Sequence, residues 1–363
     1  MALADLERRA AAGDVEAQRS LAQDLDAQGR HSDAIDWWAR AGKAGDAQAL
    51  TVLGLRLTTG QNAPRLPAQG VQLLADAARA GGAEAAGHLA VLAGAGFHVR
   101  QSWTGALDLL LRSAELGSCS AQKQLEILAG RAPDADGEGR WRSLRQAVDL
   151  GFWTGAPEAA VISASPRVFS VTGLIPPAAC AWVIEQSAAR LVRAELYDPA
   201  TGKPVLGTET RLNRIANFAM ADTCLLNLLI QARVSAAAGI PFGMMEAFAV
   251  LNYAVGEEYG EHFDYLDPAL PGYAQELARM GQRIATCLIY LNEGYDGGET
   301  EFPKLGVSFK GGQGDALVFF SADPASGRPD PRTVHAGRTP TSGQKWLLSQ
   351  FFRNRPVIGA GPG

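Results

Sequence analysis

Cysteine is scarce in this sequence, and the few cysteines that occur are scattered. They form no CxxC pair and no framework spacing, and they stand at Cys119, Cys180, Cys224 and Cys287. A disulfide-stapled domain is therefore not indicated. Four reduced thiols in a cytoplasmic protein are the favoured interpretation, although the spacing alone leaves a disulfide open.

Long apolar runs are missing as well. No stretch reaches the roughly 18 uninterrupted apolar residues that a membrane-spanning helix needs. The charged residues Asp5, Glu7 and Arg8 follow closely on Met1, where a signal peptide would carry its apolar core. We therefore expect neither a membrane anchor nor a secretion signal.

An excess of positive charge is also absent. The chain has 33 Lys and Arg against 38 Asp and Glu, a formal net charge of −5, which argues against a nucleic-acid-binding surface. The hydrophobic fraction of 47% and the charged fraction of 20% are typical of a globular protein. A length of 363 residues favours two domains.

The first 155 residues are rich in Ala, Leu and Gly and contain an internal repeat. Five glycines are separated by 32, 36, 36 and 34 residues, namely Gly13, Gly45, Gly81, Gly117 and Gly151. Glycine readily adopts the left-handed conformation that ends a helix, so each is predicted to close a helix. A period in the mid-thirties is typical of helix-turn-helix solenoids.

The repeat motifs carry a resemblance of their own. An Ala-x-x-Leu-Gly pattern and the segment from Trp37 to Ala41 (Trp-Trp-Ala-Arg-Ala) resemble Sel1-like repeats of the tetratricopeptide type. About four degenerate units cover residues 8–155, and we assign a helical repeat domain to residues 1–155. The resemblance implies a concave surface that recruits a protein. The alternative, that these helices only cap and solubilise the second domain, stays open.

From about residue 165 the sequence pattern changes. Two helices are predicted, at residues 178–191 and 222–238. Short apolar runs then alternate with Gly, Pro and Asp turns, at residues 247–253, 284–291, 316–320 and 346–352. Several short strands at this spacing predict an antiparallel sandwich or barrel, with the two helices against one of its faces.

Two of the five histidines stand in this strand-rich part. On a strand, His262 and Asp264 would point to the same face. His335 lies 73 residues beyond His262 and can complete two imidazoles and one carboxylate around a metal. Such a facial set leaves coordination positions open, as non-haem Fe(II) oxygenases require. Lys345 follows ten residues later and supplies a cation for a dicarboxylate co-substrate.

The flanking motifs resemble the catalytic domains of prolyl 4-hydroxylases. The matching segments are Gln282–Asn292, Gly297–Pro303, Gly314–Phe320, Asp330–Gly337 and Gly343–Trp346. They occur in the expected order over roughly residues 165–356, to which we assign the catalytic domain. The resemblance implies a double-stranded β-helix (jelly-roll) fold. It also implies Fe(II), 2-oxoglutarate, O₂ and, as a further cofactor, ascorbate.

Carried over position by position, the resemblance implies that His262, Asp264 and His335 bind the iron. It implies that Lys345 pairs with the distal carboxylate of 2-oxoglutarate. The apolar residues that follow Lys345 would bury its stem and demand a partner for its charge.

Four further positions match family residues. Tyr253 matches a tyrosine near the co-substrate, and Thr286 matches a hydroxyl donor to it. Simple strand packing is the alternative, because both residue types favour strands. Tyr259 and Arg211 match positions near the target peptide, although Arg211 is followed by Leu-Asn where the family has Thr-Ser. Two segments rich in Pro and Gly, residues 265–273 and 322–330, are predicted to close over the substrate.

The expected reaction is hydroxylation of a prolyl residue in a peptide or protein, recruited by the repeats, with release of succinate and CO₂. One alternative keeps the chemistry but changes the target to a free amino acid, a small metabolite or another side chain. A second alternative is a non-catalytic scaffold or an oxygen- or iron-responsive binding module. The partners expected are a peptide or protein substrate and O₂, without nucleic acid or membrane.

Overall fold

The computed structural model describes residues 3–132, 137, 139–197, 204–206, 211–218 and 222–357, with the backbone alone for residues 195–197 and 204–206. Contacts divide the chain into two compact units. Unit 1 comprises residues 1–149 and 220–228, and unit 2 comprises residues 150–219 and 229–363. None of the helices that the structure describes is both long enough and apolar enough to cross a membrane.

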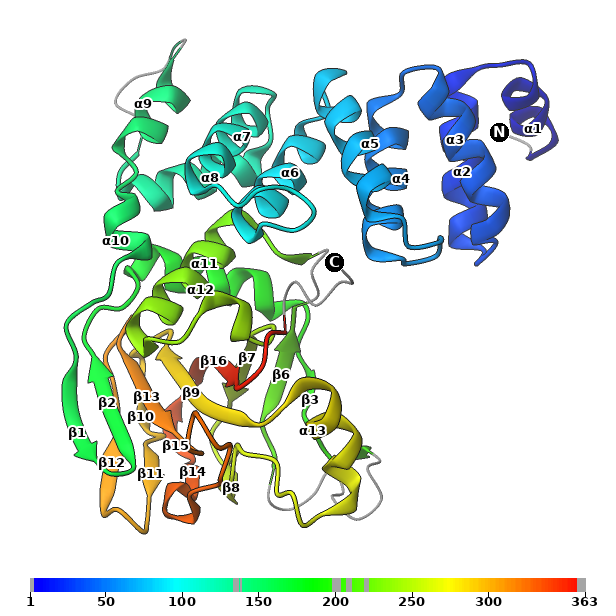
Figure 1. The fold of residues 1–363 in the computed structure, drawn as a ribbon. Helices are drawn as coiled ribbons and strands as arrows, with labels where there is room; N and C mark the ends of the chain where they lie inside the picture. Colours follow the sequence, from blue (N-terminus) through cyan, green and yellow to red (C-terminus); the bar gives the residue numbers. More distant parts are fainter. Residues whose placement is uncertain are drawn as a thin grey trace. The chain divides into compact units, whose positions relative to one another are not determined.

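Unit 1 is built from antiparallel helix pairs (Figure 1). Within the described residues its helices are α1 (Leu3–Ala11), α2 (Val15–Ala27), α3 (His31–Lys43), α4 (Ala47–Thr59), α5 (Pro67–Arg79), α6 (Ala83–Ala95), α7 (Trp103–Glu115), α8 (Cys119–Ala129) and α9 (Arg140–Ala147). Each helix packs mainly against its neighbours in sequence, as in a solenoid. The predicted helical repeat architecture is confirmed.

The repeat glycines end helices as the spacing predicts, with one exception. Their φ angles are 95°, 89°, 92° and 96° at Gly13, Gly45, Gly81 and Gly117. Gly151 instead lies inside α10 (Leu150–Thr154), so the prediction for this glycine is wrong. Polar side chains cap the helices that follow: Asp14 and Asp46, for example, accept the amides of Ala17 and Ala49.

Two glycines let α4 and α5 meet backbone to backbone. A Cβ atom on Gly70 would lie 2.3 Å from the Thr58 hydroxyl and 2.6 Å from the Gly54 carbonyl oxygen. Leu74 and Ala77 of α5 are fully buried beside this contact. Small residues at a helix crossing therefore replace side-chain interdigitation at this point.

Unit 2 is an antiparallel β-domain with short helices. Its helices are α10, α11 (Pro177–Ala188), the main part of α12 (Leu225–Ala238), α13 (Ala274–Met280) and the 3₁₀ turns η2 (Phe242–Met244), η3 (Pro271–Tyr273) and η4 (Pro331–Thr333). The strands are β1 (Ala160–Ala164), β2 (Arg167–Val171), β3 (Val192–Arg193), β4 (Glu195–Tyr197), β5 (Pro204–Leu206), β6 (Arg214–Asn217), β7 (Ala249–Tyr253), β8 (Tyr259–His262), β9 (Arg283–Tyr290), β10 (Tyr295–Gly297), β11 (Thr300–Phe302), β12 (Val307–Phe309), β13 (Ala316–Phe320), β14 (His335–Gly337), β15 (Pro340–Gly343) and β16 (Lys345–Arg353).

Two sheets enclose the core of this unit. The large sheet has the order β1-β2-β13-β9-β16-β7-β6-β3, and the small sheet has the order β12-β11-β14-β8. The ring of Phe302 from the small sheet packs edge-on against Phe319 from the large one, with centroids 5.0 Å apart. Both belong to one buried aromatic and aliphatic cluster. The predicted jelly-roll architecture is confirmed.

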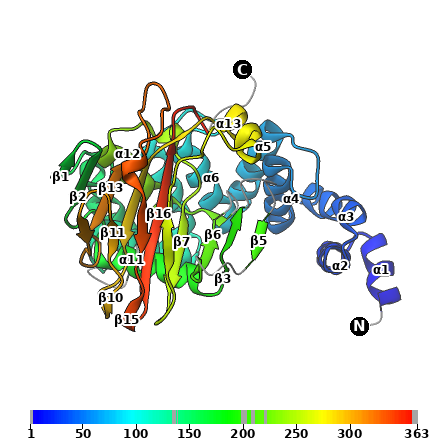
Figure 2. The same ribbon diagram turned by 90° about the horizontal axis from the view of Figure 1, so that it is seen from below.

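Alternation along β16 separates the two faces of the large sheet. Gln350 faces the helices, where its amide oxygen accepts a hydrogen bond of 2.8 Å from Gln231 of α12. Leu347 and Phe351 lie on the opposite face, toward the small sheet. In Figure 2, β16 and β7 run side by side at the centre of the large sheet, and β9 is the other neighbour of β16. The long apolar strands predicted from the sequence are all in this sheet.

Candidate active site

The small sheet brings the two predicted metal-binding histidines together. β8 ends at His262 and β14 begins at His335, and the two residues are directly opposite one another in the antiparallel pair. Asp264 lies just past the end of β8 and is buried. Phe263, which stands between His262 and Asp264, is 40% exposed. The alternation of an extended chain therefore continues beyond the strand and turns the carboxylate toward the imidazoles.

The three side chains form a compact cluster of possible ligands. The Nε2 atoms of His262 and His335 each lie 3.6 Å from one carboxylate oxygen of Asp264. One ligand atom from each residue lies within 4.8 Å of the other two. Two imidazoles and one carboxylate on one side of a point are the donor set of a facial metal site.

Backbone carbonyls fix both imidazoles. The Nδ1 atom of His262 lies 2.8 Å from the carbonyl oxygen of Gly260, and that of His335 lies 3.1 Å from the carbonyl oxygen of Thr333. A carbonyl can only accept, so Nδ1 carries the proton in each ring. The lone pair of each Nε2 is thereby directed at the cluster, as metal ligation requires.

The protonation states of the cluster also suit a cation. Burial would raise the pKa of Asp264, but His335, His262 and a hydrogen bond of 2.6 Å from the Thr286 hydroxyl hold it well below its usual range. Burial, together with His262, lowers the pKa of His335 to about 4. At neutral pH the carboxylate is charged and His335 is neutral, the forms that bind metal ions.

Tyr259 and Arg211 flank the cluster on one side. The ring of Tyr259 stacks on His262 with centroids 3.5 Å apart and an interplanar angle of 9°. The Arg211 guanidinium lies over the ring of Tyr259, 4.5 Å from its centroid. An isolated β-bridge joins the backbones of Arg211 and Tyr259. The two predicted substrate residues are therefore neighbours of the first histidine.

Lys345 enters the core from β16 and is fully buried. Its ammonium nitrogen lies 5.1 Å from the ring centroid of Tyr253 and 5.6 Å from that of Tyr290. It has no hydrogen-bond partner among the residues that the structure describes. Burial lowers its pKa to about 7, with Glu299 opposing the shift and Lys310 adding to it. A buried cation without a partner is costly, so this site is suited to an anionic ligand.

A cavity of about 940 Å³ opens in front of the cluster. Its wall includes all three cluster residues, Tyr253, Tyr259 and Arg211. Aromatic rings contribute much of the remaining wall, from Phe263, Tyr265, Tyr273 and Phe351. The cavity thus combines a metal-type donor set, an aromatic wall and room for more than one ligand.

The comparisons with known proteins agree with this geometry. The family described as the 2OG-Fe(II) oxygenase superfamily matches residues 248–353. A putative prolyl 4-hydroxylase of Acanthamoeba polyphaga mimivirus is 30% identical over 189 residues, covering 52% of this chain and 75% of that protein. Prolyl 4-hydroxylase 1 of Arabidopsis thaliana is 29% identical over 229 residues, covering 60% of this chain and 78% of that protein.

The chain belongs to the prolyl 4-hydroxylase family of 2-oxoglutarate- and Fe(II)-dependent oxygenases. It is accordingly a 2-oxoglutarate-dependent dioxygenase. The repeat region has a solved relative in a Sel1 repeat protein from Oxalobacter formigenes, which is 19% identical over 41% of this chain and 64% of that one, with a TM-score of 0.32.

The residues present fit both cofactors of a prolyl 4-hydroxylase-type enzyme. The donor set of His262, Asp264 and His335 suits Fe(II), which accepts neutral imidazoles and a hard carboxylate. The Lys345 ammonium, which has no hydrogen-bond partner among the described residues, suits the far carboxylate of 2-oxoglutarate. Tyr253 is directly opposite Lys345 in the strand pair and lines the cavity. The predicted site residues therefore lie close together. The Thr286 hydroxyl donates a hydrogen bond to the carboxylate of Asp264.

Several polar residues of this site are absent from the sequence-based prediction. Thr300 is buried at the cavity wall, 2.9 Å from the Tyr290 hydroxyl. Arg283 also lines the cavity and donates two hydrogen bonds to Glu246, of 2.8 and 3.0 Å. Thr300 stands in the Gly-Gly-Glu-Thr turn, whose family match could have indicated it. The Arg283–Glu246 pair spans 37 residues and has no local sequence signal.

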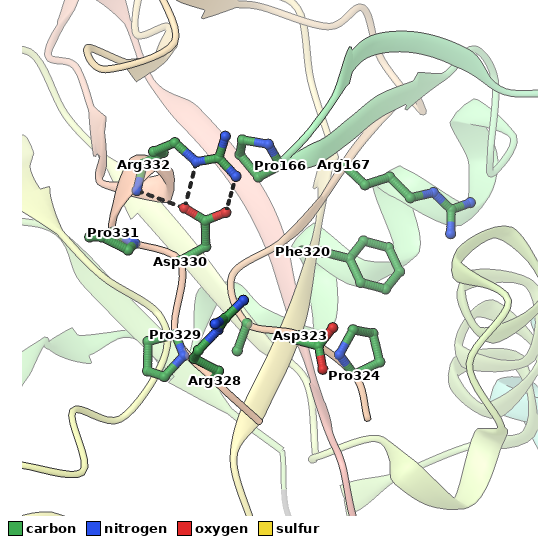
Figure 3. A pocket seen from close by; sticks show the side chains of 11 residues that line it. Pro166, Arg167, Phe320, Asp323, Pro324, Arg328, Pro329, Asp330, Pro331 and Arg332 are labelled. Atoms are coloured by element: carbon green, nitrogen blue, oxygen red, sulfur yellow. Dashed lines mark hydrogen bonds and ion pairs between the residues drawn. The ribbon is translucent and has the colours of Figure 1, made fainter. Parts of the chain in front are cut away.

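A second hollow lies beside the segment that leads to His335. It has a volume of about 530 Å³ and is lined mainly by proline and arginine side chains (Figure 3). Arg332 forms an ion pair with Asp330, whose carboxylate also accepts the Arg332 amide and so caps η4. This turn supplies the Thr333 carbonyl that fixes His335. The predicted closing segment 322–330 thus lines this hollow, whereas Tyr265 and Tyr273 of segment 265–273 line the main cavity.

Proposed function

We propose that this dioxygenase hydroxylates a prolyl residue in a peptide or protein, with release of succinate and CO₂. One observation carries the proposal: the buried His262–Asp264–His335 cluster opens onto the large aromatic cavity, with the unpaired Lys345 in the adjoining core. The relatives named as prolyl 4-hydroxylases supply the identity of the target residue.

In this proposal His262, Asp264 and His335 bind Fe(II), and Lys345 and Tyr253 hold 2-oxoglutarate. When bound, iron and 2-oxoglutarate supply the oxidation. One oxygen atom of O₂ enters succinate as the keto acid loses CO₂, and the other is inserted into a C–H bond of the substrate. The protein residues fix geometry and exclude water. Asp264 and His335 are buried, and a hydrogen bond to a backbone carbonyl orients each of the two imidazoles.

Thr286 has two proposed roles that differ in what its hydroxyl touches. In the structure the hydroxyl donates a 2.6 Å hydrogen bond to Asp264, which orients the proposed metal ligand and favours its charged form. The co-substrate contact implied by the family resemblance stays a prediction. Tyr259 and Arg211 are proposed to hold the target residue, because both line the cavity beside His262.

The target class is tested by incubating the full chain, Fe(II), 2-oxoglutarate and O₂ with prolyl peptides, free amino acids and a metabolite panel. We expect succinate formation and a gain of one oxygen atom in prolyl peptides. Oxygen gain confined to a free amino acid or metabolite would favour the alternative substrate class. Failure to bind either iron or 2-oxoglutarate would favour a non-catalytic binding module. Addition of ascorbate to the same reactions tests whether it sustains turnover.

We further propose that the repeat unit recruits the protein substrate. The support is its architecture: paired helices of a Sel1-like type, which form a solenoid with a continuous surface. A cytoplasmic location, predicted from the scattered cysteines, is a proposal that cell fractionation would test.

A further inference from the structure

A second polar atom in the core of unit 2 shares the situation of Lys345. Tyr295 of β10 is 4% exposed and belongs to the same buried cluster as Tyr253 and Tyr290. Its hydroxyl has no hydrogen-bond partner among the residues that the structure describes. A buried hydroxyl normally finds a partner, so a lone one calls for an explanation.

Tyr295 and Lys345 flank the same point in the fold. A Cβ atom built on Gly298 would lie 3.0 Å from Cε2 of Tyr295 and 3.2 Å from Cδ of Lys345. The backbone of Gly298 has φ of +70°, a conformation that side chains with a Cβ rarely adopt. Because glycine has no Cβ, the Tyr295 ring and the Lys345 stem can both approach position 298.

Tyr290, a second tyrosine of this cluster, differs from Tyr295. The Tyr290 hydroxyl lies 2.9 Å from the Thr300 hydroxyl and donates to the carbonyl oxygen of Phe309 at 3.0 Å. Its hydrogen bonds are satisfied within the protein. Tyr295 and Lys345, by contrast, are both left without an acceptor in the described part of the chain.

The chemistry of the two groups selects the kind of acceptor. Burial raises the pKa of Tyr295, so its hydroxyl stays protonated and can donate throughout the physiological range. An ammonium group can only donate as well. Two donors whose side chains flank one point, one of them cationic, match a carboxylate with its two acceptor oxygens.

We propose that the Tyr295 hydroxyl, together with Lys345, binds the distal carboxylate of 2-oxoglutarate, so that Tyr295 helps to select a five-carbon dicarboxylate as the co-substrate. This inference rests on the proposed function of the site. It adds a binding residue from β10 to those from β7 and β16, and it explains why the turn before β11 carries a glycine at position 298.

The test uses the full chain loaded with Mn²⁺ in place of Fe(II), and calorimetric titration with 2-oxoglutarate and with 2-oxopentanoate, which lacks the distal carboxylate. Tyr295→Phe removes only the hydroxyl. It should raise the Kd of 2-oxoglutarate about tenfold or more, since a hydrogen bond to a charged group is lost. It should leave the Kd of 2-oxopentanoate unchanged. Thr341→Val, which removes a hydroxyl at an exposed position of β15, is the control and should change neither.

Thermal unfolding without co-substrate separates this role from a structural one. Because the hydroxyl has no acceptor among the described residues, Tyr295→Phe should be as stable as the unaltered chain or more stable, whereas loss of an internal hydrogen bond would lower the melting temperature. An unchanged Kd for 2-oxoglutarate, or equal weakening of both keto acids, would overturn the inference. If the unaltered chain fails to bind 2-oxoglutarate at all, the proposed function fails instead.

Discussion

The metal cluster shows how neighbouring residues determine the chemistry of a side chain. An isolated aspartate would lose its charge on burial, but at Asp264 two imidazoles and the Thr286 hydroxyl outweigh the cost of burial. His262 and His335 are set by single carbonyl groups two residues before them. Of these supports, the Thr286 hydroxyl belongs to a side chain and can be removed by a single substitution.

Thr286→Val keeps the shape of the side chain and removes the hydrogen bond to Asp264. We expect metal affinity to fall about 10- to 100-fold, the usual effect of losing a supporting contact to a ligand, with little change in the fold. Competition with a metal-sensitive dye would measure it. Thr341→Val, at an exposed position of β15, is the control. Equal affinity in both variants would show that the hydroxyl does not support the carboxylate.

Binding of 2-oxoglutarate should depend on pH through Lys345. Burial lowers the pKa of this lysine to about 7, so the free site is charged below that pH and increasingly neutral above it. A bound carboxylate favours the charged form, so binding above pH 7 takes up a proton and affinity falls as pH rises, by up to about tenfold per unit. Below pH 7 this group adds no dependence.

The ratio of the Kd values for 2-oxopentanoate and 2-oxoglutarate isolates this effect, since titration of the metal ligands affects both acids alike. The preference for 2-oxoglutarate should decline above neutral pH in the unaltered chain, and it should be smaller and independent of pH in this range in Lys345→Met. A preference that stays constant through the alkaline range would contradict the assigned role of Lys345.

At the residue scale, the sequence predicts what depends on short spacing. His262 and Asp264 stand two residues apart, and Lys345 follows His335 by ten, so their chemistry is visible in the sequence. The ion pairs of Glu246 with Arg283 and Arg353 join residues 37 and 107 positions apart. The fold alone brings these charges together, so no local pattern indicates them.

At the scale of helices and strands, two glycines of unit 1 differ in the space available for a side chain. Both lie inside helices, where replacing glycine by alanine stabilises by roughly 0.5–1 kcal/mol. At Gly87 the added Cβ would meet only the Ser113 hydroxyl, at 3.4 Å. At Gly70 it would lie below 3.0 Å from three atoms, two of them backbone atoms of α4. Overpacking of this kind costs typically about 1–3 kcal/mol.

We therefore expect opposite signs for the two substitutions. Gly87→Ala should raise the free energy of unfolding by about 0.5–1 kcal/mol, and Gly70→Ala should lower it by about 1 kcal/mol or more, because the clash exceeds the gain in helix propensity. Urea unfolding followed by circular dichroism gives both values. If Gly70→Ala were as stable as Gly87→Ala, the close approach of α4 and α5 would not limit this position.

Elements differ in how far the sequence predicts them. Strands β7, β9, β13 and β16 coincide with the predicted apolar runs because they are buried on both faces and read as continuous hydrophobic segments. The short strands β11 and β14 have three residues each and no such signal. They are specified by pairing with one another, a long-range property that local patterns do not contain.

At the scale of the whole molecule, the proposed recruitment by the repeats predicts a dependence on substrate length. A short prolyl peptide reaches only the cavity, whereas an intact protein substrate can also bind the repeat unit. We expect a KM at least about tenfold lower for the intact protein at similar kcat, because added binding away from the reacting centre contributes affinity without new chemistry. Steady-state kinetics with both substrates would show it, and equal KM values would contradict recruitment.

Deletion of the repeat region would not test recruitment cleanly. Unit 1 includes residues 220–228 as well as the first 149, and the Leu226 amide donates to the Gln124 side chain at 3.1 Å. Removing residues 1–155 would strip Leu226 of this partner. Kinetics on the full chain avoid that ambiguity.

The central claim is that His262, Asp264 and His335 form the iron site of a 2-oxoglutarate-dependent dioxygenase. The most direct measurement is succinate produced from 2-oxoglutarate by the full chain with Fe(II), O₂ and a prolyl peptide, compared between His262→Ala and His31→Gln, a control in the repeat unit. We expect succinate formation by the control and a rate at most about one thousandth as high in His262→Ala. Succinate formation retained by His262→Ala would contradict it.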